Sequence, residues 1–137
     1  MKKIKNYIEE YKKTCNIYVP ESFWKYDEVT LAMMTNGCGP KGIGDFIVPD
    51  TAYLLSIKAA CIIHDFMYSI GETLLDKKRA DKFFKDNMLK IINKKSKFWL
   101  LKILRRIRAF EYYEAVSIGG YEAFREAIID NKNIKKK

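Results

Sequence analysis

The sequence predicts a mainly α-helical fold, and three observations support this prediction. Apolar residues recur at helical spacing over three long stretches, at about 52–69, 75–93 and 97–116. No pair of segments alternates convincingly as strands do, although a short hairpin between helices is compatible with the pattern. The chain has 137 residues, of which 48% are hydrophobic and 14% aromatic, which is enough for one domain with a substantial core.

The first part of the chain predicts two short helices. Ile4, Ile8 and Tyr11 are spaced as on one helix face, so residues 2–13 are expected to form an amphipathic helix. Residues 22–34 are compatible with a second helix. The residues expected in its core are Phe23, Trp24, Val29, Leu31 and Met34.

Residues 36–44 interrupt the helical pattern with four glycines and one proline in nine residues. Successive glycines permit unusual backbone torsions and leave carbonyl groups accessible. A hard cation such as Ca²⁺ takes several oxygen ligands, among them backbone carbonyls and a carboxylate. A plain turn or a phosphate-binding loop is the alternative, although the Gly-Lys-Ser/Thr sequence of a P-loop is absent.

Two long helices follow, joined by a short turn, and they are expected to pack antiparallel. The first covers about 52–69, with Asp50 or Thr51 as its N-cap. The second covers about 75–93, with Asp76 as the candidate cap. Their expected core residues are Leu54, Leu55, Ala59, Ile62, Ile63 and Phe66 in the first helix, and Ala80, Phe83, Phe84, Met88, Ile91 and Ile92 in the second.

The C-terminal third predicts one further long helix over 97–116, a last helix near 121–130, and a disordered basic tail over 131–137. Residues 94–108 contain seven basic and no acidic residues, together with tryptophan and several leucines. This composition is typical of a segment that lies at a membrane interface. The alternative is an ordinary surface helix that packs its apolar residues on the core. Those apolar residues are Leu100, Leu101, Leu104 and Ile107.

The chain carries 26 Lys and Arg residues against 17 Asp and Glu, a formal charge of +9, which favours nucleic acid or an anionic membrane surface as partner. No apolar run approaches the ~20 residues that span a bilayer. The N-terminus lacks the apolar core of a secretory signal, which leaves peripheral membrane action and non-classical export open. Three cysteines cannot form a complete disulfide framework, and neither a CxxC pair nor a second histidine supports a zinc site.

The candidate chemistry centres on the only histidine of the chain, His64. Cys61, Asp65 and Tyr68 stand at −3, +1 and +4 relative to it, so all four side chains share one helix face. Reflection about a turn centred near residue 72.5 places Asp81 opposite His64 on the second long helix. Asp76 and Asp86 are the competing acids.

A carboxylate behind a histidine holds its tautomer and stabilises the imidazolium that forms when the ring accepts a proton. Tyr68 lies one helical turn from His64, where it could hydrogen-bond the same carboxylate. Asp65 could supply a carboxylate to a cation held by the glycine-rich loop. The alternative is a buried polar network that only supports the core.

Taken together, Asn36-Gly37-Cys38-Gly39-Pro40-Lys41-Gly42, Cys61-Ile62-Ile63-His64-Asp65-Phe66-Met67-Tyr68 and Ala80-Asp81-Lys82-Phe83-Phe84 resemble phospholipase A2. The likeness covers about residues 35–90. It is nearest to the disulfide-poor branches, namely the domain of parvovirus capsid proteins and similar bacterial or phage proteins, and to the group XII secreted enzymes. Residues 1–130 would then form a single phospholipase A2-like domain with its core at 35–93.

The resemblance implies a role for each matching residue. His64 would be the base that deprotonates the attacking water, Asp81 its buried partner, and Tyr68 a hydrogen-bond donor to Asp81. Asp65 would bind Ca²⁺. The remaining Ca²⁺ ligands would be backbone carbonyls near Gly37, Gly39 and Lys41. The resemblance also implies a disulfide bond between Cys38 and Cys61.

The expected function is therefore Ca²⁺-dependent hydrolysis of the sn-2 ester of glycerophospholipids, at a phospholipid surface that is anionic. The alternative is a non-catalytic basic module with the same fold that binds membranes or a partner. A nucleic-acid-binding helical protein would leave the glycine-rich loop and His64 unexplained, so no nucleic acid is expected as partner.

Overall fold

A computed structural model describes residues 3–35 and 51–135 of the chain, and this part is mainly helical, as predicted. The elements are, in order, α1 (Ile4–Cys15), the 3-10 helix η1 (Glu21–Lys25), α2 (Glu28–Met34), strands β1 (Thr51–Ala52) and β2 (Leu55–Ser56), α3 (Lys58–Ile70), α4 (Leu74–Lys95), α5 (Trp99–Gly119) and α6 (Tyr121–Lys135). Within these two described stretches, no helix is both long and apolar enough to cross a membrane.

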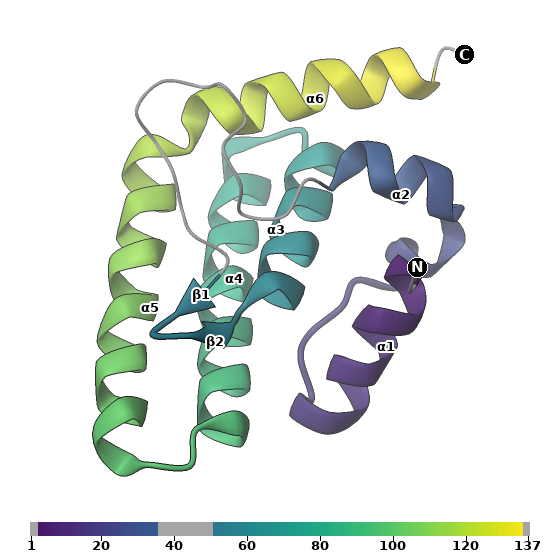
Figure 1. Ribbon diagram of the computed structural model, residues 1–137. Coiled ribbons are helices and arrows are strands. Elements are labelled where there is room, and N and C mark those ends of the chain that lie inside the picture. The colour runs from purple at the N-terminus through teal and green to yellow at the C-terminus, as the bar shows by residue number, and fades with distance from the viewer. Residues whose placement is uncertain (1–2, 36–50, 136–137) are drawn as a thin grey trace.

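The centre of the fold is the antiparallel pair of α3 and α4 (Figure 1). α5 runs back along α4, α6 crosses the end of α3, and α1 and α2 cover the opposite side. Every residue of α3 from 59 to 69 is buried. A helix that is covered on all sides places its polar residues in the interior as well, and this is how His64 comes to be buried.

The turn between α3 and α4 is short because α4 begins with a complete capping box. Thr73 is the N-cap, and its hydroxyl accepts a hydrogen bond from the Asp76 backbone N–H at 3.2 Å. The Asp76 carboxylate accepts in return from the Thr73 backbone N–H at 3.1 Å. The prediction of Asp76 as the cap was therefore wrong by three residues, although Asp76 does help to start the helix.

The helix predicted over 52–69 begins only at Lys58, because the preceding residues form the small antiparallel hairpin β1–β2. Thr51 lies in β1 rather than at a helix cap, and Asp50 lies outside the described residues. The turn residues Tyr53 and Leu54 both have positive φ, 45° and 67°. Such turns usually contain asparagine or glycine, so the sequence carried no hairpin signal.

Contacts from α5 hold this hairpin in place. Arg105 donates to the Tyr53 carbonyl at 2.9 Å, and the Tyr112 hydroxyl donates to the Thr51 carbonyl at 2.9 Å. Leu54, expected in the core, is instead exposed at the turn. These long-range hydrogen bonds stabilise a turn that its own residues disfavour.

Two other helix predictions were wrong in extent. The segment 22–34 divides into η1 and α2, because Asp27 caps α2 by accepting from the Thr30 backbone N–H at 2.8 Å, and Val29 is exposed rather than in the core. The tail expected to be disordered from residue 131 continues α6 as a helix to Lys135.

The N-terminal part is fastened to α4 by Asn87, which is fully buried. The Asn87 amide donates to the Tyr18 carbonyl at 3.0 Å and accepts from the Tyr18 backbone N–H at 2.7 Å. One side chain thus satisfies both polar groups of one backbone residue.

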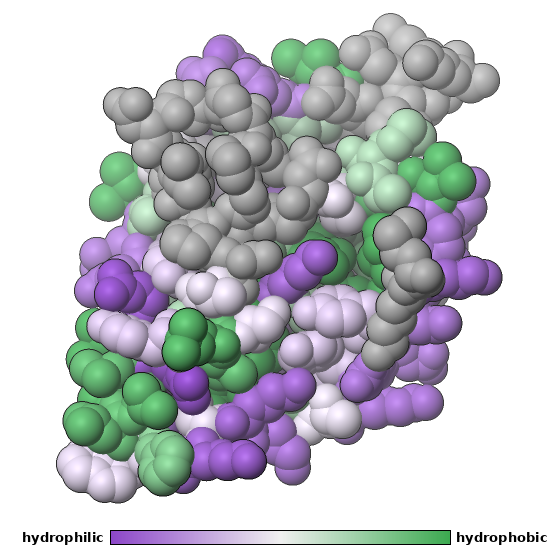
Figure 2. Space-filling model, in the orientation of Figure 1, coloured by the Kyte–Doolittle hydropathy of each residue, from purple (hydrophilic) through white to green (hydrophobic). Residues whose placement is uncertain are grey.

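α5 packs on α4 through a narrow face, in which Ala109 and Val116 are the buried residues. Leu101 and Leu104 are half-buried, but Leu100 and Ile107 are exposed, so the alternative in which all four pack on the core was wrong for two of them. Figure 2 shows the resulting hydrophobic side chains gathered at the lower left, over the N-terminal half of α5.

Candidate active site

Four buried polar side chains from α3 and α4 meet in one hydrogen-bonded group, which we call the Asp81 network. His64 Nε2 lies 2.8 Å from Asp81 Oδ1, and the Tyr68 hydroxyl donates to the same oxygen at 2.5 Å. The Lys77 ammonium donates to the other oxygen, Oδ2, at 2.7 Å. The structure therefore brings His64, Tyr68 and Asp81 together as the sequence predicted, and adds a lysine.

The local sequence explains why position 64 meets position 81. Because the capping box at Thr73 keeps the turn short, equal distances from the turn face each other across the helix pair. Of the two competing acids, Asp76 is used in that capping box, and Asp86 is only half-buried. Asp81 is the acid that lies inward, 2% exposed.

Aromatic contacts fix the orientation of the His64 ring. Phe84 on α4 stacks against the imidazole with ring centroids 4.6 Å apart, and the Tyr68 ring lies 4.1 Å away. Since Nε2 faces Asp81, the ring points Nδ1 away from the carboxylate. This nitrogen has no hydrogen-bond partner among residues 3–35 and 51–135.

Asp81 is ionised within this network. Its burial acts to raise the pKa of the carboxyl group, but the hydrogen bonds and charge interactions from His64, Lys77 and Tyr68 outweigh burial and leave the pKa below the ordinary 3.8. Burial and the neighbouring Asp81 charge strongly raise the pKa of the Tyr68 phenol, so it stays protonated and donates. An ionised Asp81 makes Nε2 of a neutral His64 the donor, and Nδ1 is then the acceptor.

Lys77 is the member of the network that the sequence analysis missed. Its side chain is 97% buried, and its ammonium also donates to the Val116 and Ser117 carbonyls near the end of α5, at 3.0 and 3.3 Å. The Tyr121 ring lies 4.3 Å from the same nitrogen. Lys77 precedes Asp81 by four residues, and this spacing places it on the inward face of α4.

Close packing around the network depends on Gly120. A Cβ atom there would lie 2.4 Å from the Val116 carbonyl oxygen and 2.7 Å from the Tyr68 hydroxyl. Any side chain at this position would displace one of the two groups that surround Lys77 and Asp81. The glycine between α5 and α6 therefore preserves the network geometry.

The expected metal site is only partly within the described residues. Asp65 is buried on α3 beside His64, and its carboxylate is the type of oxygen donor that Ca²⁺ prefers. Gly37, Gly39 and Lys41, expected to provide carbonyl ligands, lie outside the described residues. Across the described part, no group of three His, Cys, Asp or Glu side chains could hold a metal ion.

Cysteine chemistry differs between the two described cysteines. Cys61, one turn before His64, is disulfide-bonded, whereas Cys15 is a free buried thiol. Cys38, the partner that the resemblance implies, lies outside the described residues. The disulfide takes Cys61 out of consideration as a nucleophile, because a disulfide sulfur carries no thiolate.

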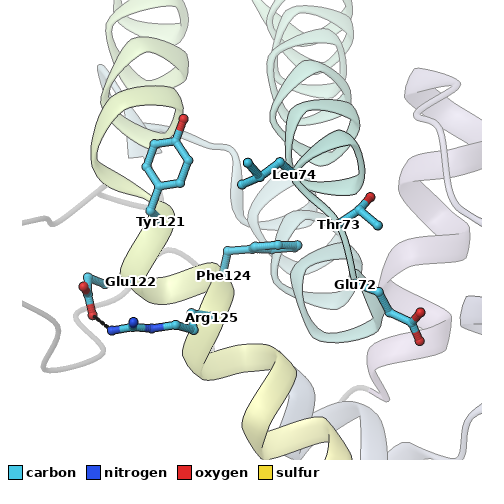
Figure 3. Close-up of a pocket in the computed structure, with 7 residues that line it drawn as sticks. All are labelled: Glu72, Thr73, Leu74, Tyr121, Glu122, Phe124 and Arg125. Carbon is cyan, nitrogen blue, oxygen red and sulfur yellow. Dashed lines mark hydrogen bonds and ion pairs between the residues drawn. The ribbon is translucent and has the colours of Figure 1, made fainter.

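A groove of about 310 Å³ lies between the start of α4 and α6 (Figure 3). Phe124 forms part of its wall and meets the Tyr68 ring nearly edge-on, with centroids 5.2 Å apart. A Cβ atom at Gly71 would lie 2.6 Å from the Phe124 ring, so this glycine lets α6 approach the turn. The residues that line the groove include none of the Asp81 network.

Comparisons of the chain with protein-family models, with curated proteins and with solved structures found no match. A functional interpretation therefore depends on the geometry of the Asp81 network and on the motifs of the sequence.

Proposed function

We propose that this protein is a Ca²⁺-dependent esterase of the phospholipase A2 type, which releases the sn-2 acyl chain of glycerophospholipids. The observation that carries the proposal is the 2.8 Å contact between His64 Nε2 and an ionised Asp81. This contact leaves one nitrogen of a buried, oriented imidazole available as a base. The three ordered sequence motifs that resemble phospholipase A2 support the choice of substrate.

His64 would act as the general base through Nδ1. A water molecule gives a proton to Nδ1 while its oxygen attacks the sn-2 carbonyl carbon. The proton then passes from His64 to the glycerol oxygen as the ester C–O bond breaks, so a fatty acid and a lysophospholipid leave. No acyl-enzyme forms, and His64 returns to its neutral state.

Asp81 and its neighbours would stabilise the protonated form of His64. The Lys77–Asp81 pair is neutral as a unit, so the network carries no net charge while His64 is neutral and one positive charge when it is protonated. Tyr68 and Lys77 satisfy Asp81 on both oxygens, which prevents the carboxylate from turning away from Nε2. The network thus keeps the base in one tautomer and orientation.

Ca²⁺ would be held by Asp65 and by backbone carbonyls near Gly37, Gly39 and Lys41. When bound there, it would polarise the ester carbonyl and stabilise the negative charge that develops on its oxygen. Among the described residues, one oxygen donor matches the needs of Ca²⁺. This donor is the carboxylate of Asp65, which is buried and directly follows the base His64 in the chain.

The test is fatty-acid release from phospholipid vesicles with added Ca²⁺ and with a chelator. We expect release only with Ca²⁺, and we expect His64→Gln and Asp65→Asn each to lower the rate by at least 100-fold. Ser69→Ala is the matched control, because Ser69 is another buried polar residue of α3 whose hydroxyl bonds the Met34 carbonyl, outside the network. Release that persists without Ca²⁺, or in His64→Gln, would refute the mechanism.

One observation favours the alternative, a non-catalytic basic module. Lys77 connects Asp81 to two carbonyls of α5, so the network also joins α3, α4 and α5 as a structural element would. This alternative expects vesicle binding that weakens with salt, no release of fatty acid, and a loss of stability in His64→Gln. The release assay therefore separates the two functions.

A further inference from the structure

We infer that the N-terminal half of α5 is a docking surface for an anionic phospholipid bilayer. The surface, which we call the α5 stripe, consists of exposed apolar residues in a segment without carboxylates. It is formed by Trp99, Leu100, Ile103, Ile107 and Phe110. The inference adds to the proposed function the surface through which the protein would bind the bilayer that contains its substrate. It rests on that proposed function.

The residues of the stripe lie on one side of the helix. At roughly 100° per residue they fall within an arc of about 100°, away from the face that buries Ala109 and Val116. Trp99 is 73% exposed, Ile107 51% and Ile103 44%. Five large apolar side chains on one solvent-facing arc are more than scattered exposure explains, and such patches mark interaction surfaces.

Charge identifies the occupant. Between Asp86 and Glu111 the chain has no acidic residue, whereas residues 94–108 contain seven basic ones. Arg105 and Arg108 are engaged with the hairpin at Tyr53, but Lys102 and Arg106 form no ion pair in the part of the chain that the structure describes. An apolar arc bordered by unpaired cations matches the acyl chains and the anionic head groups of a bilayer.

The other possible occupants match this surface less well. A second copy of the chain would bring two such basic segments together, and the like charges would repel. Nucleic acid would neutralise the cations but would leave the five apolar side chains in water. A bilayer with anionic lipid satisfies both features together.

The centre of the stripe is distant from the Asp81 network, which reaches α5 at Val116. Val116 follows Ile103 by thirteen residues, or about 20 Å along a helix, whereas it follows Phe110, the last residue of the stripe, by six residues, or about 9 Å. Figure 2 shows the hydrophobic side chains at the end of α5 that is far from α6, at the lower left. Docking and hydrolysis can therefore be tested separately.

The experiment measures co-sedimentation of the full-length His64→Gln protein with vesicles, in the presence of chelator so that hydrolysis cannot alter the lipid. Vesicles of phosphatidylcholine alone are compared with vesicles that contain one-third phosphatidylglycerol. We expect binding to the anionic vesicles, with partition falling as salt rises. Ile103→Asp and Ile107→Asp should each lower the partition at least tenfold, because an apolar side chain leaves the interface and a negative charge enters it. Lys102→Gln and Arg106→Gln should each lower it about fivefold.

The matched control is Val29→Asp, which places the same charge on another exposed aliphatic residue, in α2 on the opposite side of the molecule (Figure 1). Its partition should stay within twofold of the parent protein. The docking surface would be overturned if Val29→Asp and Ile103→Asp lowered the partition onto vesicles equally, or if the protein did not bind anionic vesicles. A dimer that Ile103→Asp dissociates, without vesicle binding, would overturn it in favour of self-association.

A second measurement separates this inference from the proposed function. Hydrolysis of a short-chain phospholipid, dispersed as monomers, needs no bilayer and is assayed with the unsubstituted protein. Release from monomers without vesicle binding would refute the α5 stripe and leave the proposed esterase standing. Stripe-dependent binding without any release would refute the esterase and leave the docking surface standing.

Discussion

α4 buries three polar side chains, and two of them, Asp81 and Asn87, are satisfied in different ways although they lie only six residues apart. Asn87 is fully buried, and both of its hydrogen-bonding groups pair with the backbone of one residue, Tyr18. Asp81 is 2% exposed and lies in hydrogen-bond contact with three ionisable side chains, His64, Tyr68 and Lys77. The Asn87 site is closed, whereas the Asp81 network retains one unpaired imidazole nitrogen within the described residues.

This difference is informative because ionisable groups are costly to bury. A neutral amide that pairs with backbone loses little on leaving water, but each buried charge requires a partner of opposite charge and further hydrogen bonds. A polar residue that serves packing alone can be a neutral amide paired with the backbone, as Asn87 is. The larger cost at Asp81 is consistent with the general base that we propose.

The largest expected effect comes from Asp81→Asn. The amide cannot hold His64 in the tautomer that leaves Nδ1 as acceptor, and the same change behind a catalytic histidine in a Ser-His-Asp triad costs about 10⁴-fold in kcat. We expect a loss of about 10³ to 10⁴-fold in fatty-acid release, measured on protein shown by circular dichroism to be folded.

Asn87→Ala is the control for that comparison. It should lower the free energy of unfolding by about 1–3 kcal/mol, because the two backbone groups of Tyr18 lose their partners. The activity per folded molecule should not change. A loss of activity in Asn87→Ala as large as that in Asp81→Asn would mean that the two sites do not differ in kind.

The next largest effect is expected from Lys77→Met, which leaves the buried Asp81 charge without its lysine. Breaking a buried ion pair by removing one partner costs about 3–5 kcal/mol. The double variant Lys77→Met with Asp81→Asn should be more stable than the sum of the single changes implies, because no uncompensated charge remains. Urea unfolding measures all three.

Lys82→Met serves as the matched change for Lys77, since Lys82 is an exposed lysine on the same helix. Its free energy of unfolding should stay within about 0.5 kcal/mol of the parent value. If the changes in the free energy of unfolding of Lys77→Met and Asp81→Asn simply added in the double variant, the ion pair would not be the source of the loss of stability.

A smaller effect is expected from Tyr68→Phe. The ring keeps its packing against His64 and Phe124, but Asp81 Oδ1 loses one of two donors. We expect a loss of about 1–2 kcal/mol in the free energy of unfolding. Activity should fall by less than in Asp81→Asn, because His64 keeps its partner. An equal loss of activity would give Tyr68 a larger role than orienting the carboxylate.

The smallest effect is a difference in pH dependence. The pKa of Asp81 is lower in the folded chain than its ordinary value of 3.8, so the folded state holds its proton less tightly than the unfolded state. The stabilisation is complete at pH values above 3.8 and is lost as the pH falls from there through the lower, folded pKa. Between pH 6 and pH 3, the free energy of unfolding of Asn87→Ala should change with pH as that of the parent protein does. The free energy of unfolding of Asp81→Asn should change less with pH.

The sequence was sufficient for the parts of the site that depend on local spacing. Helical periodicity places His64, Asp65 and Tyr68 on one helix, and a short turn makes position 81 face position 64. Lys77 was missed because a lysine is rarely buried, although its spacing from Asp81 matched the inward face of α4. The hairpin at Thr51–Ser56 was missed because Tyr53 and Leu54 are unusual turn residues.

The amino-acid sequence by itself determined which residues form long helices and that His64 and Asp81 meet, because both follow from short-range hydrogen bonding and a capped turn. Tertiary structure alone decided that Lys77 lies inside, that residues 51–56 leave the helix, and that the α5 stripe faces solvent. These outcomes depend on contacts between residues far apart in the chain, such as Lys77 with Val116 and Arg105 with Tyr53. Burial of a lysine or exposure of a leucine follows from what the rest of the chain places beside it, which periodicity does not encode.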